Sequence, residues 1–257
     1  MYKGLYTAYT GMINEQHRMD VLTNNLANAD TNGYKKEGAT SQAFDTVLAL
    51  KIKDASEPGN LPRHIGTANL GVKIGENYTD YLQGPLKVTG NSYDLAITGD
   101  GFFNIEFTNK GGETSTKYTR DGAFVVSTDG YLMTKDGDYV LGDRGRVKID
   151  PKQEVVIDEL GFVRQGDREV AKIKITNFAD YNYIEHYGEN YYQPVEGATE
   201  AEYFGQIRQG YLETSNVQVV QEMVEMISVS RQYESNQKII TTIDNTAQIA
   251  STQLGKV

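Results

Sequence analysis

The chain reads YLETSNVQVVQEMVEMISVSRQYESNQKIITTIDNTAQIASTQL from Tyr211 to Leu254, a stretch that contains neither glycine nor proline. These two residues are the least compatible with a helix interior, so the stretch predicts one long helix. At about 1.5 Å per residue such a helix would be roughly 65 Å long, more than one compact domain requires. Its apolar residues recur at spacings of three, four or seven, with interruptions at Ser230 and Gln237: Val219, Met223, Met226, Tyr233, Ile240, Ala247 and Leu254.

A second apolar row widens this stripe over the first turns and consists of Val217, Val220, Val224 and Ile227. A helix with so wide an apolar face is stable only when other helices cover it. We therefore expect the C-terminal helix to need partners, and we count Ile227 with the predicted interface residues.

The N-terminus predicts a second amphipathic helix, from Lys3 to Asn28, that tolerates Gly4 and Gly11. It ends before Asn32-Gly33, a pair that favours a turn with positive φ. Its apolar residues follow a three-four pattern interrupted by Gln16: Leu5, Tyr9, Met12, Met19, Leu22 and Leu26.

Two amphipathic helices at opposite ends of one chain are expected to pair with each other as a coiled-coil-like domain. The pair would still have faces left for neighbouring copies. The alternative is a terminal helical hairpin that closes a monomeric domain, and the pattern alone favours neither.

Composition limits the possible functions. The 257 residues are 39% hydrophobic and 23% charged, enough for one large or two modest domains. A net charge of -10 argues against binding nucleic acid or an anionic membrane surface. The absence of cysteine excludes disulfides and thiolate metal sites. We expect no cleaved signal peptide and no membrane span, because no segment has the required apolar length.

The middle of the chain has two parts. Residues 35–77 are expected to be an extended linker or hinge, with a turn at Glu57–Pro62. Residues 78–208 alternate short apolar runs with Asp-Gly turns, which is typical of antiparallel strands in a sandwich or open barrel. With residues 1–34 and 209–257 as a terminal helical assembly domain, the predicted fold is α+β.

The part from Asp180 to Tyr203 is rich in tyrosine. Tyrosine combines a large contact area with a polar tip and is frequent in interfaces. A tyrosine-lined edge of the β domain explains the same composition equally well.

The sequence carries no recognisable catalytic, cofactor or metal signature. His17, His64 and His186 are scattered without a metal-ligand spacing, and Gly99-Asp100-Gly101 is better explained as a hairpin turn than as a phosphate-binding loop. We expect neither enzymatic activity nor a cofactor.

Four ungapped motifs resemble those of flagellar basal-body rod and hook proteins, in the same order along the chain. They are Leu22–Asn28 with Thr31, Gly33, Tyr34 and Lys35; Asp94–Phe103; Tyr118–Gly122; and Gln209–Val217 continuing to Lys238. Gly90-Asn91 and Gln209–Glu213 resemble the distal rod protein most. Thr23, where the family usually has a small apolar residue, and the tyrosine-rich part depart from the pattern.

This resemblance implies a structural subunit of the flagellar rod, a hollow axial tube that transmits torque from motor to hook. Its implied partners are further copies of the chain in a helical assembly, neighbouring rod and hook proteins, and the flagellar export apparatus that carries it out of the cytoplasm. Asn24, Asn25 and Asn28 are expected either to hydrogen-bond between subunits or to cap the helix. Two other functions remain open, an extracellular adhesion module and a peptidoglycan hydrolase.

Overall fold

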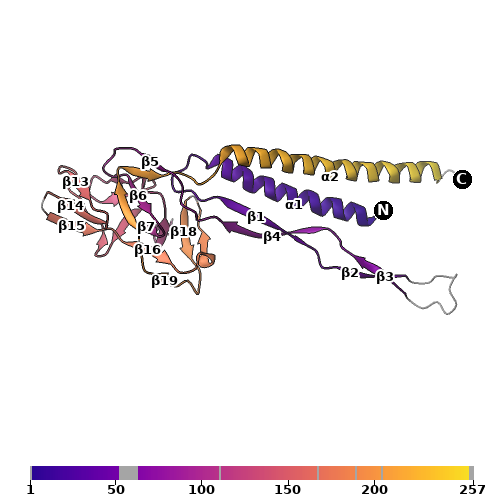
Figure 1. Cartoon of the computed structure of the whole chain (residues 1–257), viewed down its shortest axis with the longest axis horizontal. Helices are drawn as coiled ribbons and strands as arrows, with labels where there is room; N and C mark the ends of the chain where they lie inside the picture. The colour runs from indigo at the N-terminus through magenta and orange to yellow at the C-terminus, as the bar shows by residue number, and fades with distance from the viewer. Residues whose placement is uncertain are drawn as a thin grey trace. The chain divides into compact units, whose positions relative to one another are not determined.

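The computed structural model describes residues 2–51, 63–109, 111–166, 168–188, 190–203 and 205–254. The chain divides into two compact units (Figure 1). The helical unit comprises Met1–Leu26, Glu37–Asp80 and Gln218–Val257, and the β unit comprises Ala27–Lys36 and Tyr81–Val217. An N-terminal helix, a C-terminal helix and a mostly β middle confirm the predicted α+β class, whereas the sandwich or open barrel stays a prediction.

In the helical unit, helix α1 (Tyr2–Ala27) runs antiparallel to helix α2 (Val219–Leu254). A Cβ placed on Gly4 would lie 3.7 Å from Ile243 Cδ1, and one on Gly11 would lie 3.0 Å from Asn236 Nδ2. These contacts are seven residues apart on both helices. The two glycines that the sequence analysis treated as merely tolerated therefore allow the helices to approach closely.

Helix α2 begins later than predicted. Tyr211–Glu213 forms strand β21, which pairs with strand β5 (Leu86–Val88), and the helix begins only at Val219. The Thr214 amide also donates to the Pro85 carbonyl at 2.9 Å. The absence of glycine and proline permits a helix but does not require one, and here pairing with a distant strand outweighs helix propensity.

The described part of the expected linker forms strands. These are β1 (Glu37–Ala43), β2 (Val47–Lys51), β3 (Arg63–Ala68) and β4 (Val72–Thr79), and β1 pairs with β4 and β2 with β3, both antiparallel. The predicted turn at Glu57–Pro62 lies outside the described residues. Asn14 Nδ2 on α1 donates to Ser41 Oγ at 2.9 Å, and His17 Nε2 lies 2.9 Å from Asn77 Oδ1, so α1 contacts the β1–β4 ladder as well as α2.

The β unit contains antiparallel pairs throughout its described strands. Its largest sheet has the order β17-β18-β8-β7-β11-β10-β9, with β16 and β12 attached at β7 and β11, and β19 attached at β16. Strands β13, β14 and β15 form a second sheet, and β20 pairs with β6. The bounds not yet given are β6 (Leu95–Thr98), β7 (Phe102–Thr108), β8 (Thr114–Thr119), β9 (Val125–Val126), β10 (Leu132–Met133), β11 (Tyr139–Gly142), β12 (Gly145–Arg146), β13 (Val155–Ile157), β14 (Phe162–Gln165), β15 (Arg168–Lys172), β16 (Ile175–Phe178), the 3-10 helix η1 (Tyr181–Tyr183), β17 (Ile184–His186), β18 (Tyr191–Pro194), β19 (Glu200–Ala201) and β20 (Gln206–Gln209).

Two apolar runs within residues 78–208 do not form one strand each. Val147–Ile149 is not a strand, because the Val147 amide bonds to Val140 whereas the Ile149 amide bonds to Gly130, so its partners lie on two different segments. The run from Val170 to Ile175 is divided between β15 and β16.

The tyrosine-rich part belongs to the β unit. Tyr191 and Tyr192 lie on β18 and are buried, and the Tyr181 ring stacks on Tyr81 with centroids 4.9 Å apart. Tyr183 and Tyr187 are exposed. The buried members thus line the β unit itself, as one of the two readings of this stretch expects, whereas an interface role concerns only the exposed pair.

Tyr203 provides a test of this packing. Its hydroxyl oxygen is buried and has no hydrogen-bond partner among the described residues, and burial raises the pKa of Tyr203 to about 12. Because the folded pKa exceeds the ordinary value of 10.0, the associated stability is present below pH 10 and lost as the pH rises through about 12.

We therefore expect Tyr203→Phe to leave stability at pH 7 unchanged or raised by up to about 1 kcal/mol, since it removes an unpaired polar atom. It should also weaken the alkaline destabilisation, measured by urea unfolding between pH 8 and pH 12. Tyr183→Phe, which removes an exposed hydroxyl, is the control and should change neither quantity. A clear loss of stability at pH 7 in Tyr203→Phe would show that the hydroxyl has a partner.

Candidate functional site

The first polar cluster joins the two terminal helices inside the helical unit. Asn25 is completely buried, and its Nδ2 donates to the Glu37 carbonyl oxygen at 2.7 Å and to Glu222 Oε2 at 3.3 Å. Its Oδ1 accepts from the Glu37 amide at 2.9 Å. Nearby, Arg18 reaches Glu225 at 3.0 Å. A single amide side chain therefore joins α1, the start of β1 and α2 within one chain.

The predicted interface residues fall into three groups. Leu22 and Asn25 are buried, and eight others are half-buried: Leu5, Met12, Met19, Leu26, Asn28, Met226, Tyr233 and Ile240. Six are exposed: Tyr9, Asn24, Val219, Met223, Ile227 and Ala247. The side chain of Leu254 lies outside the described part of the chain.

Asn28 lies at the C-terminal end of α1, where its backbone carbonyl accepts from the Thr31 amide at 3.2 Å and its Oδ1 accepts from the Thr31 hydroxyl at 3.3 Å. Both of these bonds lie at the end of α1. The sequence analysis did not identify Glu222, Val229, Asn236 and Ile243 as positions of α2 that are buried or half-buried. Their exact spacing of seven was the available signal, because Gly4, Gly11 and Asn25 show the same period on α1.

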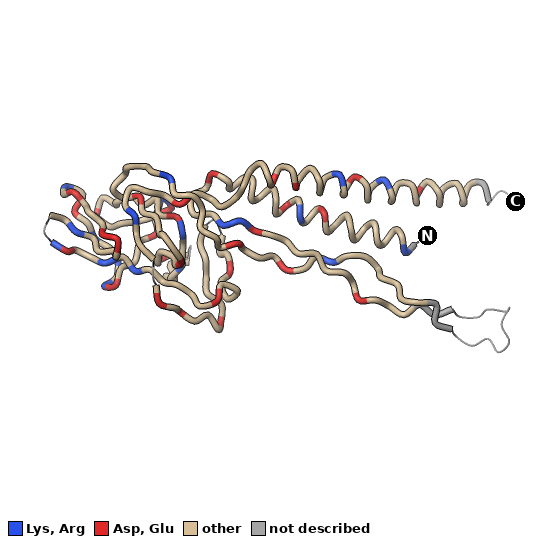
Figure 2. Tube along the Cα trace, viewed as in Figure 1, with Lys and Arg blue, Asp and Glu red and all other residues tan. Residues whose placement is uncertain are grey.

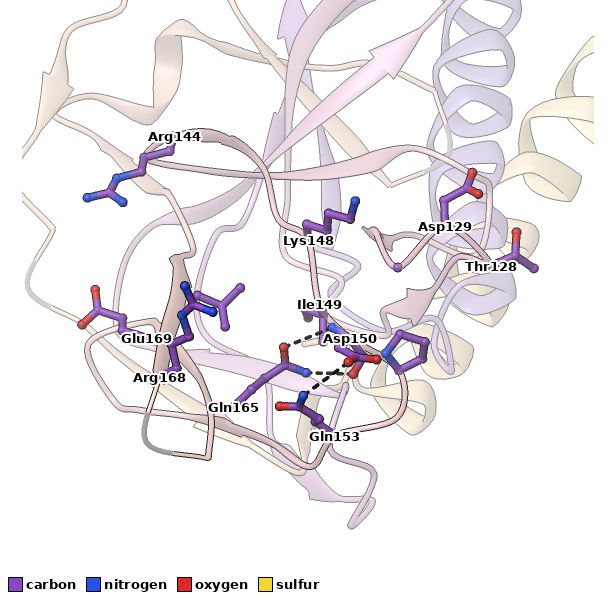
Figure 3. A pocket seen from close by; sticks show the side chains of 13 residues that line it. Thr128, Asp129, Arg144, Lys148, Ile149, Asp150, Gln153, Gln165, Arg168 and Glu169 are labelled. Carbon is purple, nitrogen blue, oxygen red and sulfur yellow. Dashed lines mark hydrogen bonds between the residues drawn. The ribbon is translucent and has the colours of Figure 1, made fainter.

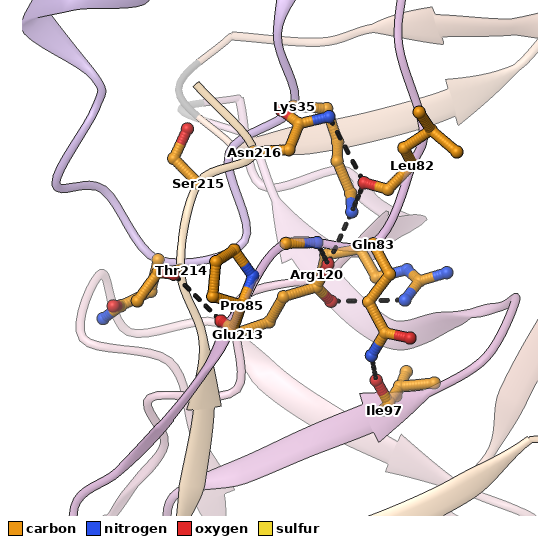
Figure 4. A network of polar contacts seen from close by, with 12 residues as sticks. Lys35, Leu82, Gln83, Pro85, Ile97, Arg120, Glu213, Thr214, Ser215 and Asn216 are labelled. Atoms are coloured by element: carbon orange, nitrogen blue, oxygen red, sulfur yellow. Dashed lines mark hydrogen bonds and ion pairs between the residues drawn. The ribbon is translucent and has the colours of Figure 1, made fainter. Parts of the chain in front are cut away.

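The second polar cluster is a buried group of charges in the β unit (Figure 4). Lys35, Arg120 and Glu213 are all almost completely buried. Glu213 Oε1 lies 2.5 Å from Lys35 Nζ and Oε2 lies 3.2 Å from Arg120 Nη1. Lys35 Nζ also donates to the Leu82 carbonyl at 2.8 Å, and the Gly84 amide donates to Glu213 Oε1 at 2.9 Å.

Backbone geometry completes this charge cluster. The Gly33 amide donates to the Glu213 carbonyl at 2.8 Å, and Gly33 has φ 68°. A Cβ at this position would lie 2.5 Å from the carbonyl carbon of Arg120, so no larger residue fits. Lys35, Arg120 and Glu213 come from three of the four motifs in the sequence, yet no local pattern indicated that they meet.

An open hollow on the β unit is the main alternative location for chemistry (Figure 3). Arg144, Lys148 and Arg168 line it together with the carboxylates of Asp129, Asp150 and Glu169, so their formal charges balance. Figure 3 shows Asp129 and Glu169 on opposite sides of the hollow. Gln165 holds the Asp150 backbone, accepting from its amide at 3.1 Å and donating to its carbonyl at 2.8 Å.

Among the described carboxylates, Asp121 has the raised pKa that a catalytic acid requires. Burial raises its pKa, and the charges of Asp136 and Asp94 add to this shift. Its Oδ1, however, accepts from the Ala123 amide at 3.0 Å, as an aspartate in a tight turn does. In the described residues we find no group of three metal-ligating side chains and no helix able to cross a membrane.

Three known sequence families match the chain. Residues 5–35 match "Flagella basal body rod protein", residues 96–166 match "Flagellar hook protein FlgE/F/G D1 domain" and residues 208–253 match "Flagellar basal body rod FlgEFG protein C-terminal". The flagellar basal-body rod protein FlgF of Caulobacter vibrioides is 35% identical over 100% of both chains. The chain belongs to the flagellar basal-body rod protein family. The resemblance seen in the four motifs is thus confirmed.

Other members of this rod family are similar over nearly the whole length. FlgG of Agrobacterium fabrum is 34% identical over 98% of this chain and 99% of its own, and FlgG of Bacillus subtilis is 33% identical over 96% and 97%. The FlgF and FlgG relatives are therefore about equally similar to the chain. Assignment to the distal rod protein stays a prediction.

The charge cluster of this rod-family chain can be tested by removing its carboxylate. Glu213→Ala would leave two buried cations without their shared partner, so we expect a loss of about 3–5 kcal/mol of unfolding free energy. Urea unfolding followed by tyrosine fluorescence is suitable, because the chain has no tryptophan. Glu106→Ala is the control: it removes an ion pair with Arg146 that is partly exposed, 2.8 Å long, and worth about 1 kcal/mol at most. Equal losses in both variants would contradict a special role for Glu213.

Two amide side chains of α1 provide a matched test of the first polar cluster. Asn25→Ala removes three hydrogen bonds from a buried position and should cost about 1–3 kcal/mol. Hydrogen exchange in the last turns of α1 should accelerate accordingly. Gln16→Ala removes an exposed amide of the same helix and should lie within about 0.5 kcal/mol of the unmodified chain. If Asn25→Ala is equally mild, the cluster does not hold the two helices together.

Proposed function

We propose that this chain is a structural subunit of the bacterial flagellar rod that self-assembles through its terminal helices into a hollow axial tube. The tube transmits torque from motor to hook, and the subunit performs no chemistry. Membership of the rod family supports the general role. The assembly step is supported by exposed apolar side chains on the side of α2 that faces away from α1.

We define the α2 outer strip as Val220, Met223, Val224 and Ile227. Their side chains are 77%, 46%, 64% and 53% exposed. Each would gain on the order of 1 kcal/mol or more from burial. Large apolar side chains gathered on one face of a helix, rather than scattered singly, are typical of protein interaction sites.

The pairing of α1 with α2 is proposed to be coiled-coil-like. The contacts Gly4–Ile243 and Gly11–Asn236 repeat after seven residues on both helices, as a heptad requires. The pairing covers one side of α2 and leaves the outer strip for a neighbour. The hairpin within the chain and the assembly between chains, which are the two hypotheses raised by the sequence, then use different sides of α2.

The proposed partners are other copies of this chain in a helical assembly, neighbouring rod and hook proteins, and the flagellar export apparatus. The proposed location is the basal body outside the cytoplasm. The names of the relatives, which include a "Flagellar hook-basal body complex protein FlhO" of Bacillus subtilis at 28% identity, support this location. We propose that the terminal assembly domain consists mainly of α1 and α2, with the β unit carried as the body of the subunit.

The test places one charge on the α2 outer strip. Val224→Asp should abolish rod formation and swimming, because a carboxylate would be buried between subunits without a partner. The purified monomer should keep its circular dichroism spectrum and thermal midpoint, because Val224 is exposed there.

The matched control is Thr242→Asp, which places the same charge at an exposed polar position of α2. We expect this variant to swim and to form rods seen by electron microscopy of basal bodies. Normal motility in Val224→Asp would contradict the proposed function. Equal loss in both variants would show that the strip is not the specific contact.

A further inference from the structure

A second apolar strip lies on α1 and is exposed in the part of the chain that the structure describes. We define the α1 outer strip as Tyr6, Tyr9 and Ile13, which are 59%, 50% and 38% exposed. Two residues of a helix correspond to about 200° of rotation. Tyr6 is two residues from Gly4, and Tyr9 and Ile13 are each two residues from Gly11, so the strip points away from α2.

The α2 outer strip is related to α1 in the same way. Val220 and Val224 are each two residues from Glu222, which bonds to Asn25 of α1. Each helix therefore packs on the other with one side and exposes an apolar strip on the opposite side. The two strips of one copy face away from each other, so they cannot meet in the same chain.

The strips also differ in their position along the helix pair. The α2 strip lies beside Asn25, at the C-terminal end of α1, whereas the α1 strip begins near its N-terminus. The offset between them is roughly 20 Å along the helix axis. A neighbour in the same orientation that joined one strip to the other would be displaced by this amount.

The two carboxylates closest to the α2 outer strip point toward α1, because Glu222 bonds to Asn25 and Glu225 lies 3.0 Å from Arg18. Residues 2–14 of α1 contain a single charged side chain, Lys3, whereas residues 219–230 of α2 contain Glu222 and Glu225 and no basic residue (Figure 2). Two copies of the α2 strip facing each other would form a closed pair and leave both α1 strips exposed. Contact of α1 with α2 instead covers both strips of every copy, so the geometry favours it over α2 against α2.

We infer that the α1 outer strip of one copy docks on the α2 outer strip of the next copy, an inference that rests on the proposed function. A contact between two different surfaces does not close on itself in a pair, so it continues into a ring or an open helical assembly. With the offset along the axis, each added copy advances and the assembly grows as a helix.

The size of the contact explains why it needs repetition. With the exposures given above, the seven side chains would bury roughly 500–600 Å² in total. A stable two-protein interface buries about 1,200–2,000 Å². One such contact does not hold a dilute pair together, but each copy uses both strips and is held by two neighbours. The purified chain is therefore expected to be a monomer in size-exclusion chromatography.

Cysteine cross-linking tests the contact directly, because the chain has no cysteine of its own. Cells would co-express a Tyr9→Cys chain and a Val224→Cys chain that carry tags of different size, and basal bodies would be isolated after mild oxidation. We expect the mixed 9–224 dimer to exceed either same-site dimer at least tenfold. A Tyr9→Cys chain with a Thr242→Cys chain is the matched control and should yield at least tenfold less mixed dimer.

A charge pair provides an independent readout. Ile13→Lys and Val224→Asp should each abolish swimming, and the double variant should restore at least a tenth of the normal swimming rate, because the new charges attract across the contact. Dominant 224–224 dimers, or no rescue together with no 9–224 dimer, would overturn this inference. The proposed function would survive that result as long as Val224→Asp alone still abolished rods.

Discussion

The burial of one carboxylate between two cations is the constraint on which the β unit depends. Glu213 lies near the end of Tyr81–Val217 and Lys35 near the end of Ala27–Lys36, the two segments that make up the unit. The Lys36 amide also donates to Asn216 Oδ1 at 2.7 Å, so the C-terminal ends of both segments are adjacent. The charge cluster therefore holds the two segments of the β unit together where each of them ends.

Close contacts between backbone segments require glycine at two positions beside the cluster. Gly33 approaches the Arg120 backbone too closely for a side chain, and a Cβ on Gly84 would lie 2.0 Å from the Thr214 carbonyl oxygen. Desolvated charges are stable only when their remaining donors and acceptors are satisfied at short range. The Gly84 amide supplies one such donor to Glu213 Oε1, whereas Arg120 Nε has no hydrogen-bond partner among the described residues.

Local patterns predicted the helices and most of the strands, because periodicity and Asp-Gly turns are properties of neighbouring residues. They did not predict that Tyr211–Glu213 pairs with Leu86–Val88, since that pairing joins segments far apart in sequence. They also missed the polar strand Thr114–Thr119, which β7 stabilises along its whole length. The apolar stripe of a helix does not show which of its sides the same chain already covers. It therefore could not separate contacts within the chain from contacts between copies. Gly4 and Gly11 mark the covered side of α1, because the absence of a side chain there lets α2 approach closely.

The polar residues between α1 and α2 have a mechanical consequence. A seam of aliphatic side chains alone would let one helix slide past the other by seven residues with little change in packing. Asn25 and Glu222 meet in a single alignment, so slippage would separate a buried amide from a buried carboxylate. The pair therefore fixes the register of α1 against α2, so that torque applied to one helix passes to the other without sliding between them.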